Sequence, residues 1–294
     1  MTQRFRTARS LSSFLLVSLA ICATPAARAA SPERIPAPLQ SRVAIHFLNE
    51  QLGDDPVAET DSFRIHHAGS RSLAEKVARL AERAKADAEE KWFGTAGEKW
   101  EPRCELFLHD DETEFCHATG LPQAIPGVST TRLDGEHLVS RRADFCCTAP
   151  NWVSTVLPHE VTHVVVTGRF RERRLPPWAN EGIAVLSEPR QRIGLHLRNL
   201  SRYRREGKLF RIEELMELPD YPRGELLGAF YAQSVSLVEF LADQKGAQAV
   251  TQFLRDGLRI GFPRSLMKHY GLSTDELDEL WRRQTLGSKE SARP

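Results

Sequence analysis

The chain has 294 residues, of which 41% are hydrophobic, a balance typical of a globular protein with a sizeable core. This length suits one large domain or two small lobes. The 40 basic and 39 acidic residues leave a formal net charge of +1, so the global positive charge of a nucleic-acid-binding protein is excluded. No apolar run reaches the roughly 20 residues of a membrane-spanning helix.

The first 29 residues have the pattern of a secretory signal peptide. A mainly apolar stretch over 11–23 is followed by Ala27-Arg28-Ala29, which places small residues where a signal peptidase cleaves. The basic residues that precede the apolar stretch are Arg4, Arg6 and Arg9. We therefore expect residues 1–29 to be removed on export.

Two other uses of this segment are disfavoured. The apolar stretch is shorter than the roughly 20 residues of an uncleaved anchor, and bulky Ile21 before Cys22 disfavours a lipid anchor. Cleavage would remove four of the 40 basic residues and no acid, leaving 36 basic and 39 acidic residues, net −3. We expect a periplasmic or extracellular protein with no stable membrane span and no nucleic-acid partner.

The N-terminal half is predicted to be an α/β lobe. Residues 30–60 are expected to form a linker and extension, rich in Pro and Ala at 31–40. Alternation of apolar and polar residues predicts a strand over 62–66, and helical spacing predicts an amphipathic helix over 72–92. Residues 104–108 have the apolar composition of a core strand.

A β-hairpin is predicted next. Strands over 128–133 and 136–139 flank Asp134-Gly135, a dipeptide suited to the positive φ angles of a type I′ turn. Such a hairpin is either a plain surface feature or an edge strand for an extended peptide substrate.

The remainder of the chain is predicted to be mainly helical. The expected helices span 178–188, 196–206, 211–217, 225–244, 246–257 and 274–286. The fold class is therefore α+β. We expect an α/β lobe over 61–168, a helical lobe over 169–288 and a disordered tail over 289–294.

Four cysteines remain after signal cleavage, and an even number in an exported protein favours disulfides. They are Cys104, Cys116, Cys146 and Cys147. Adjacent cysteines rarely bridge each other, so Cys104 and Cys116 are each expected to pair with one member of the 146/147 doublet. A zinc cluster of the four cysteines is the alternative.

The chemistry of the chain centres on the stretch LPHEVTHVVV, 157–166. His159 and His163 are four residues apart, so on a helix they share one face and can approach one zinc ion. Glu160 would then lie beside the metal, where it can accept a proton from water. The alternative is an apolar helix that carries two histidines without a metal.

A helix is expected here. Thr155 can serve as the N-cap, which places Pro158 in the first turn, where its missing N–H is harmless. Gly168 is expected to end the helix.

A catalytic zinc needs a third protein ligand. The metzincin pattern is excluded because Val166 and Arg169 stand where it requires Gly and His. Three glutamates remain, of which Glu172 falls in an arginine-rich loop and Glu188 at the far end of a short predicted helix. Glu181 lies in the first turn of that helix, within WANEGIA, and is the expected ligand.

HEVTH followed by WANEGIA resembles the gluzincin metallopeptidases, and the whole layout resembles the peptidase MA-like family of exported zinc peptidases. The resemblance covers roughly residues 60–285 and includes AFYAQSVSLVEFL, 229–241. It implies a zincin-like fold, one zinc held by His159, His163 and Glu181, and Glu160 as general base. It also implies that Tyr231 donates a hydrogen bond to the oxyanion, although a tyrosine on such an amphipathic helix is also ordinary core.

The sequence departs from related families in three ways. The 17 residues between His163 and Glu181 are one fewer than the roughly 18 of the aminopeptidases. The G-x-M-E-N motif for a substrate amine is absent, and no Asp follows Glu181 to orient a zinc histidine. His196 could approach the site.

The resemblance implies a zinc-dependent hydrolase that cleaves peptide or protein substrates. The alternative is a zinc-binding, catalytically inactive envelope protein that uses the fold as a binding module.

Two arginine clusters lie outside these motifs. The first contains Arg169, Arg171, Arg173 and Arg174, and the second Arg190, Arg192, Arg198, Arg202, Arg204 and Arg205. They are interpreted as solvated helix faces or as sites for anionic substrates.

Overall fold

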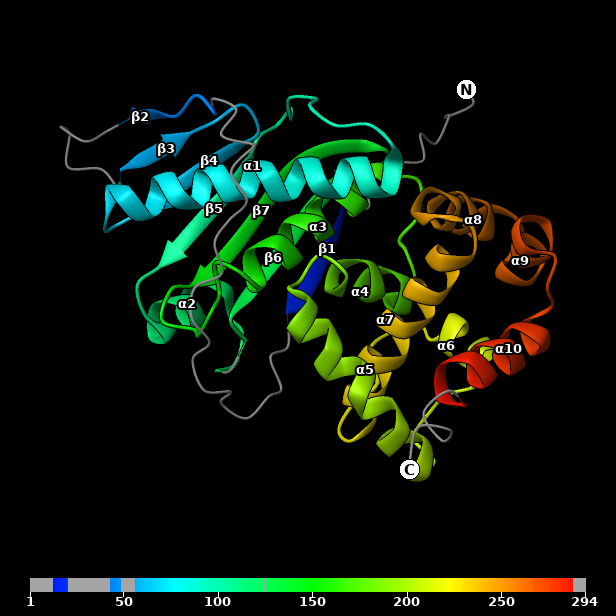
Figure 1. The fold of residues 1–294 in the computed structure, drawn as a ribbon. Coiled ribbons are helices and arrows are strands. Elements are labelled where there is room, and N and C mark those ends of the chain that lie inside the picture. Colours follow the sequence, from blue (N-terminus) through cyan, green and yellow to red (C-terminus); the bar gives the residue numbers. More distant parts are fainter. Residues whose placement is uncertain (1–12, 21–42, 49–55, 124, 288–294) are drawn as a thin grey trace, which may run out of the picture.

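The computed structural model describes residues 13–20, 43–48, 56–123 and 125–287. One mixed β-sheet with helices on its faces forms one half of the molecule, and helices alone form the other half (Figure 1). The strands are β1 (Ser13–Ala20), β2 (His46–Leu48), β3 (Val57–Glu59), β4 (Phe63–His67), β5 (Cys104–His109), β6 (Gly127–Asp134) and β7 (His137–Cys146). The helices are α1 (Arg71–Phe93), α2 (Glu112–Thr119), α3 (Val156–Arg169), α4 (Pro177–Val185), α5 (Arg190–Arg205), α6 (Ile212–Glu217), α7 (Leu226–Lys245), α8 (Ala247–Ile260), α9 (Phe262–Tyr270) and α10 (Thr274–Leu286). The mixed α/β composition agrees with the predicted α+β class.

The seven-stranded sheet has the order β1-β6-β7-β5-β4-β3-β2. Strands β4, β5 and β7 are parallel to one another, whereas β6 and β1 on one side and β3 and β2 on the other pair antiparallel. Helices α1 and α3 pack side by side on one face of this sheet (Figure 1).

The sequence of α1 explains why it forms and packs closely. Ser70 caps its N-terminus by accepting a hydrogen bond from the Leu73 amide, and Gly94 ends it in the left-handed conformation at φ 70°. A stripe of small buried residues allows the helix to approach the sheet and α3, and it contains Ala74, Val77, Ala78 and Ala81.

Helix α3 lies at the junction of the two halves. Its three consecutive valines, 164–166, are buried, as expected for a helix covered on all sides. It contacts α1 and the sheet on one side and α4 on the other. In the helical half, α7 is the central element, because α4, α5, α8 and α10 all pack against it.

Several predicted boundaries are corrected by the structure. Residues 30–60 were expected to be a linker and extension, but β2 and β3 lie within this range and extend the sheet. Both strands have only three residues, too short to show a pattern in the sequence. Helices α2 and α9 were not predicted, and the expected helix over 196–206 begins earlier, at Arg190.

The hairpin forms with its turn shifted by one residue. Asp134 pairs with His137, so the two loop residues are Gly135 and Glu136. Gly135 has φ 61°, and it is the only loop residue with positive φ. A type I′ turn needs two such residues, so the predicted turn type is wrong, and a glycine in the first loop position is instead typical of a type II′ turn.

The predicted bridge from Cys104 to the doublet is wrong. Cys104 pairs with Arg141 in the sheet, whereas Cys146 pairs with His109, five positions further along parallel strands. This offset is about 17 Å, far beyond the roughly 7 Å that a disulfide can span between Cα atoms. The same offset rules out a zinc cluster of all four cysteines.

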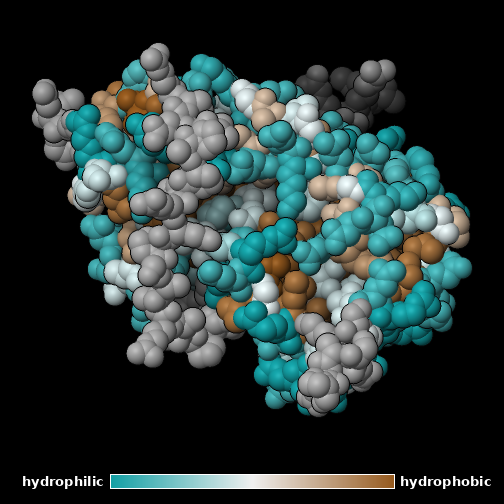
Figure 2. All heavy atoms as spheres, viewed as in Figure 1, coloured by the Kyte–Doolittle hydropathy of each residue, from teal (hydrophilic) through white to brown (hydrophobic). Residues whose placement is uncertain are grey.

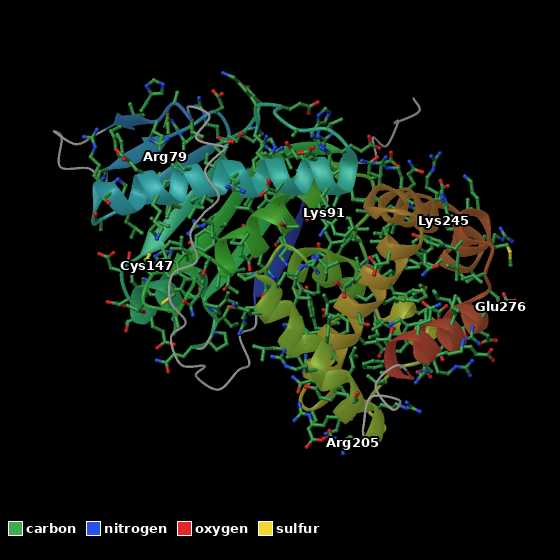
Figure 3. The ribbon with its side chains drawn as sticks, in the orientation of Figure 1. Arg79, Lys91, Cys147, Arg205, Lys245 and Glu276 are labelled. Atoms are coloured by element: carbon green, nitrogen blue, oxygen red, sulfur yellow. The ribbon has the colours of Figure 1, made fainter. Side chains whose placement is uncertain are left out.

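All four cysteines are free thiols in the structure. Cys116 packs against the small hydrophobic cluster that contains Cys146, and Cys147 lies near α2 at the end of the sheet (Figure 3). A bridge between Cys116 and the doublet therefore stays a prediction. Burial raises the pKa of the Cys147 thiol to about 12.

The N-terminal predictions fall mainly outside the described residues. Strand β1 lies inside the predicted signal peptide, and the rest of residues 1–29, the stretch 31–40 and the tail 289–294 are outside the described part. The described helices include none that is both long and apolar enough to cross a membrane. The surface in Figure 2 is mainly hydrophilic, with hydrophobic residues exposed in small groups.

Candidate metal centre

Helix α3 places both histidines of HEVTH on one buried face. The helix begins at Val156 with Thr155 in the N-cap position, as predicted, although the Thr155 side chain makes no capping hydrogen bond. It ends at Arg169, one residue beyond the predicted stop at Gly168. His159 and His163 are one turn apart and only 2% and 1% exposed.

Helix α4 supplies the third residue, Glu181. The next residue, Gly182, allows α4 to approach α7 closely. A Cβ atom at Gly182 would lie 2.5 Å from Val238 Cγ2 and 2.6 Å from the Ser234 carbonyl oxygen. Only glycine therefore permits this contact. Trp178, in the first turn of α4, is fully buried and packs edge-on against Phe262, which fixes the start of the helix.

The contact at Gly182 predicts a stability loss in the variant Gly182→Ala. Alanine normally favours a helix interior by about 0.5–1 kcal/mol over glycine, but overpacking against a backbone oxygen costs about 1–3 kcal/mol. The free energy of unfolding in urea should therefore fall. Gly194→Ala in α5 is the matched control, because its new Cβ would meet only the flexible end of Arg198, at 3.1 Å. Equal stability of Gly182→Ala and the parent would contradict this packing.

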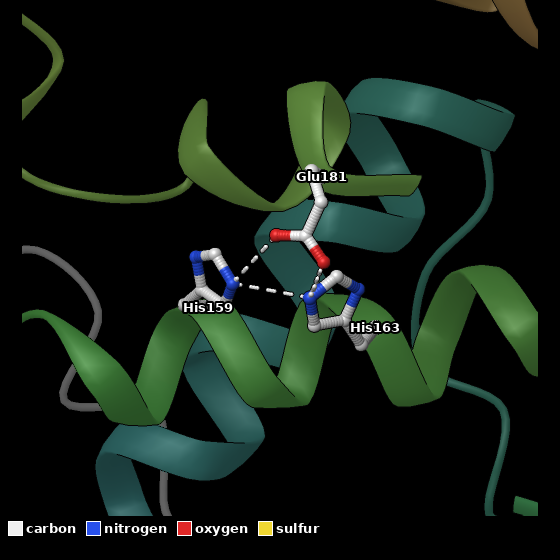
Figure 4. A group of neighbouring side chains, drawn as sticks. All are labelled: His159, His163 and Glu181. Carbon is white, nitrogen blue, oxygen red and sulfur yellow. Dashed lines mark hydrogen bonds and ion pairs between the residues drawn. The ribbon is translucent and has the colours of Figure 1, made fainter. Parts of the chain in front are cut away.

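The two helices bring three ligand atoms together (Figure 4). His159 Nε2 and His163 Nε2 are 3.0 Å apart. Each is 3.5 Å from an oxygen of Glu181, His159 Nε2 from Oε2 and His163 Nε2 from Oε1. Among the described residues this is the one group of three or more His, Cys, Asp or Glu side chains arranged to hold a metal ion.

The chemistry of the three residues fits a metal ion. Glu181 Oε2 is buried and has no hydrogen-bond partner among the described residues, so it is an acceptor that a cation would satisfy. Two imidazole nitrogens and one carboxylate oxygen form a donor set that suits a divalent transition metal. All three side chains are almost completely buried, which restricts competing water.

The charges of these three side chains also fit a bound metal ion. Burial lowers the pKa of His163 to about 4, so its imidazole is neutral at pH 7 and can act as a ligand. Burial would also lower the pKa of His159, but its interactions with Glu181 and Glu188 outweigh burial and raise that pKa well above its ordinary value. Burial would raise the pKa of Glu181, but the two histidines and Tyr221 lower it. A divalent cation would balance the Glu181 charge in place of a proton on His159.

Glu188 supplies the orienting partner that sequence reasoning did not identify. Its Oε1 is 2.9 Å from His159 Nδ1, a hydrogen bond that turns Nε2 of the same ring toward Glu181 and His163. Glu188 in turn lies 3.6 Å from Arg192 Nε. It was considered as a metal ligand on a helix, but it lies in the turn after α4, where its side chain reaches the far side of the His159 ring.

Replacing this carboxylate should weaken metal binding. Glu188→Gln keeps the size of the side chain but removes the charge that holds the His159 ring, and such changes typically cost about 10–100-fold in metal affinity. Competition with a chromophoric chelator measures the effect. Glu206→Gln, an exposed carboxylate paired with Lys208, is the control and should leave the affinity unchanged. An unchanged affinity in Glu188→Gln would remove Glu188 from the site.

Glu160, the predicted base, is fully buried beside the ligands and is held by the sheet. Its Oε2 accepts a hydrogen bond of 2.6 Å from the hydroxyl of Ser129 on β6. Ser129 was not singled out in the sequence, since nothing in the hairpin pattern indicates which residue faces α3. The bond fixes the Glu160 carboxylate between α3 and the strand next to it.

Two tyrosines lie near the group, one predicted and one not. The Tyr221 hydroxyl donates a 2.6 Å hydrogen bond to Glu181 Oε1. Tyr221 lies in the loop before α7 and was missed because no periodicity marks a loop residue. Tyr231 on α7 is 5% exposed, and burial together with the nearby Glu181 charge raises its pKa well above its ordinary value.

His196 and Glu172 lie outside the ligand group. The ring of His196 lies 6.3 Å from the ring of Tyr231, and burial lowers the pKa of His196. Glu172 is exposed in the loop after α3, where it lines a separate arginine-rich pocket.

Comparison with known proteins does not assign the chain to a family. No protein-family model matches the chain, and no curated protein matches it significantly.

Proposed function

We propose that the protein is an exported, zinc-dependent peptidase with a zincin-like fold, of the gluzincin type and similar to the peptidase MA-like family. The observation that carries the proposal is the meeting of His159, His163 and Glu181 beside the buried carboxylate of Glu160. Two histidines and a glutamate leave one coordination position of a zinc ion open, as catalytic sites require. A base next to that position is the arrangement of a metallopeptidase.

The chain's own residues would perform the proton transfers. Zinc, when bound, would polarise the scissile carbonyl and lower the pKa of a water molecule. The Glu160 carboxylate would take the proton of the attacking water and later give it to the leaving amine nitrogen. The hydrogen bond from Ser129 would keep the carboxylate in the orientation that both transfers need.

Tyrosine hydroxyls are proposed to stabilise the developing oxyanion. Tyr231 is the candidate that the family resemblance implies, and it lies near Glu181. Tyr221 is a second candidate, because its hydroxyl lies at the ligand group; its single O–H donates to Glu181 Oε1 and would have to turn from that oxygen to the oxyanion. A donor fixed in a buried site stabilises developing charge more than a mobile one in water does.

An extended peptide is proposed to bind along β6. This strand lies next to α3 and carries Ser129, so a peptide paired with it would pass Glu160. Strand β1 supports this use of β6, because it pairs antiparallel along the whole strand, with Ser18 opposite Ser129. If residues 1–29 are removed on export, β6 becomes an edge strand to which a peptide can add.

A second candidate function is a zinc-binding module that does not catalyse. The observation in its favour is burial, since His159, His163, Glu160 and Glu181 are each at most 2% exposed. A substrate would reach them only after β1 or other elements move.

Metal removal tests the proposal. The mature protein should hydrolyse members of a broad peptide library, a zinc-selective chelator should lower the rate by at least about 100-fold, and added zinc should restore it. Hydrolysis that persists without metal, or a zinc-loaded protein that cleaves nothing, would contradict the peptidase. The mature N-terminus, expected at Ala30, is read from the same sample by mass spectrometry, and an intact 1–29 segment would count against export.

A further inference from the structure

Five arginines surround a small pocket between the end of α3, the loop that follows it, and the end of α8. The pocket has a volume of about 40 Å³. Its charged lining consists of Arg169, Arg171, Glu172, Arg173, Arg255 and Arg259. All five arginines come from the two segments 169–173 and 255–259, which are far apart in the sequence and meet only in the fold.

Three of these side chains are held in place by the protein. Arg171 Nε donates a 2.8 Å hydrogen bond to the Gly168 carbonyl at the end of α3. Arg173 Nη1 donates a 2.6 Å hydrogen bond to the Leu258 carbonyl near the end of α8. The guanidinium of Arg255 lies over the ring of Phe170, 5.5 Å from its centroid. A guanidinium has five N–H donors, so each keeps donors for a ligand.

The described residues neutralise only part of the positive charge of the pocket. Arg169 lies 3.9 Å from Glu89 and 3.7 Å from Glu98. None of the other four arginines forms a salt bridge with a described residue, and Glu172 is the one acid in the lining. Arg255 and Arg259 are four residues apart on α8, a like-charge spacing that destabilises a helix unless an anion offsets it.

We propose that this pocket binds a phosphate-type anion. Guanidinium groups match the geometry of phosphate oxygens through paired hydrogen bonds, and several converging on one point select a compact, multiply charged group over a single carboxylate. Arg141, 4% exposed and with its pKa lowered to about 10 by burial, lies against Gly168 behind the pocket and adds to the positive potential.

The pocket is separate from the metal centre. His159 is in the first turn of α3 and Arg169 is its last residue, so the two are about 15 Å apart along the helix axis. The site therefore anchors a phosphate-bearing molecule without contacting the metal ligands, and its binding does not depend on the proposed peptidase activity. The phosphate belongs either to a soluble compound or to a phospholipid headgroup.

Titration with inorganic phosphate at constant ionic strength tests the site. Calorimetry should show saturable binding to the parent chain, and Arg259→Gln should weaken it at least about tenfold, as expected when a charge-assisted hydrogen bond is lost. Arg205→Gln is the control, because Arg205 is an exposed arginine at the end of α5, remote from α8 (Figure 3). Arg259 is exposed, so neither variant should lose stability in unfolding curves recorded in chloride, and losing the repulsion with Arg255 should raise that of Arg259→Gln only slightly.

Vesicles distinguish the two sources of phosphate. If the parent binds vesicles that contain phosphatidic acid but not phosphatidylcholine vesicles, and Arg259→Gln abolishes this binding, the ligand is a lipid headgroup. Phosphate binding without vesicle binding identifies a soluble ligand. The proposal is overturned if phosphate shows no saturable binding, or if Arg205→Gln weakens binding as much as Arg259→Gln does.

Discussion

Glu160→Gln should lower peptide hydrolysis by about 10²–10⁴-fold, the usual contribution of a general base, while the metal content stays at the parent value. Glutamine keeps the size of the side chain and can still interact with the Ser129 hydroxyl, so the buried packing is preserved. It cannot take a proton from water. The loss should therefore appear in kcat rather than in metal affinity or in the unfolding curve.

The control for this variant is Ser129→Ala, which leaves the carboxylate but removes the hydrogen bond that orients it. Its activity should fall less than that of Glu160→Gln. Metal analysis is made on the same samples. If Glu160→Gln retains the parent rate, Glu160 is not the base. If neither the parent nor Glu160→Gln cleaves any peptide while both carry metal, the non-catalytic module is the correct function.

His163→Ala should abolish stoichiometric metal binding, with a loss of more than about 100-fold in affinity, because it removes one of three ligand atoms. The metal should also stop contributing to stability. A ligand at 100 times its dissociation constant stabilises the folded state by about 2.7 kcal/mol. The parent should therefore unfold at a higher temperature in zinc than in chelator, and the variant at the same temperature in both.

His137→Ala is the matched control, since His137 is an exposed histidine next to the hairpin turn, where it pairs with Asp134, five positions along β6 from Ser129. It should bind metal like the parent. Glu181→Gln gives a second test that keeps the shape of the buried side chain and removes its charge. Retained metal in both His163→Ala and Glu181→Gln would show that the ion binds elsewhere.

The sequence predicted the elements whose pattern is local and long. Helices α1, α7 and α10 follow from apolar spacing over thirteen or more residues, within a residue or two at each end. The ligand trio could be predicted because two members are four residues apart on one helix and the third is marked by WANEGIA. Helix α4 could be placed because Pro176 and Pro177 end the preceding loop and Trp178 can anchor the start of the helix.

The features that could not be predicted from the sequence depend on strand register or lie in loops. The bridge expected for Cys104 failed because strand pairing, not sequence distance, decides which residues are neighbours. Glu188 and Tyr221 lie in turns, where no periodicity shows the direction of a side chain. Ser129 became visible only when β6 was placed against α3.

X-ray anomalous scattering at the zinc edge, from crystals of the mature protein grown with zinc, would locate the metal directly. We expect one anomalous peak about 2.0–2.2 Å from Nε2 of His159, Nε2 of His163 and a carboxylate oxygen of Glu181. The peak should be missing from crystals of His163→Ala grown in the same way. A zinc-soaked parent crystal with no peak at these three atoms, or with its peak elsewhere, would contradict the proposed metal site.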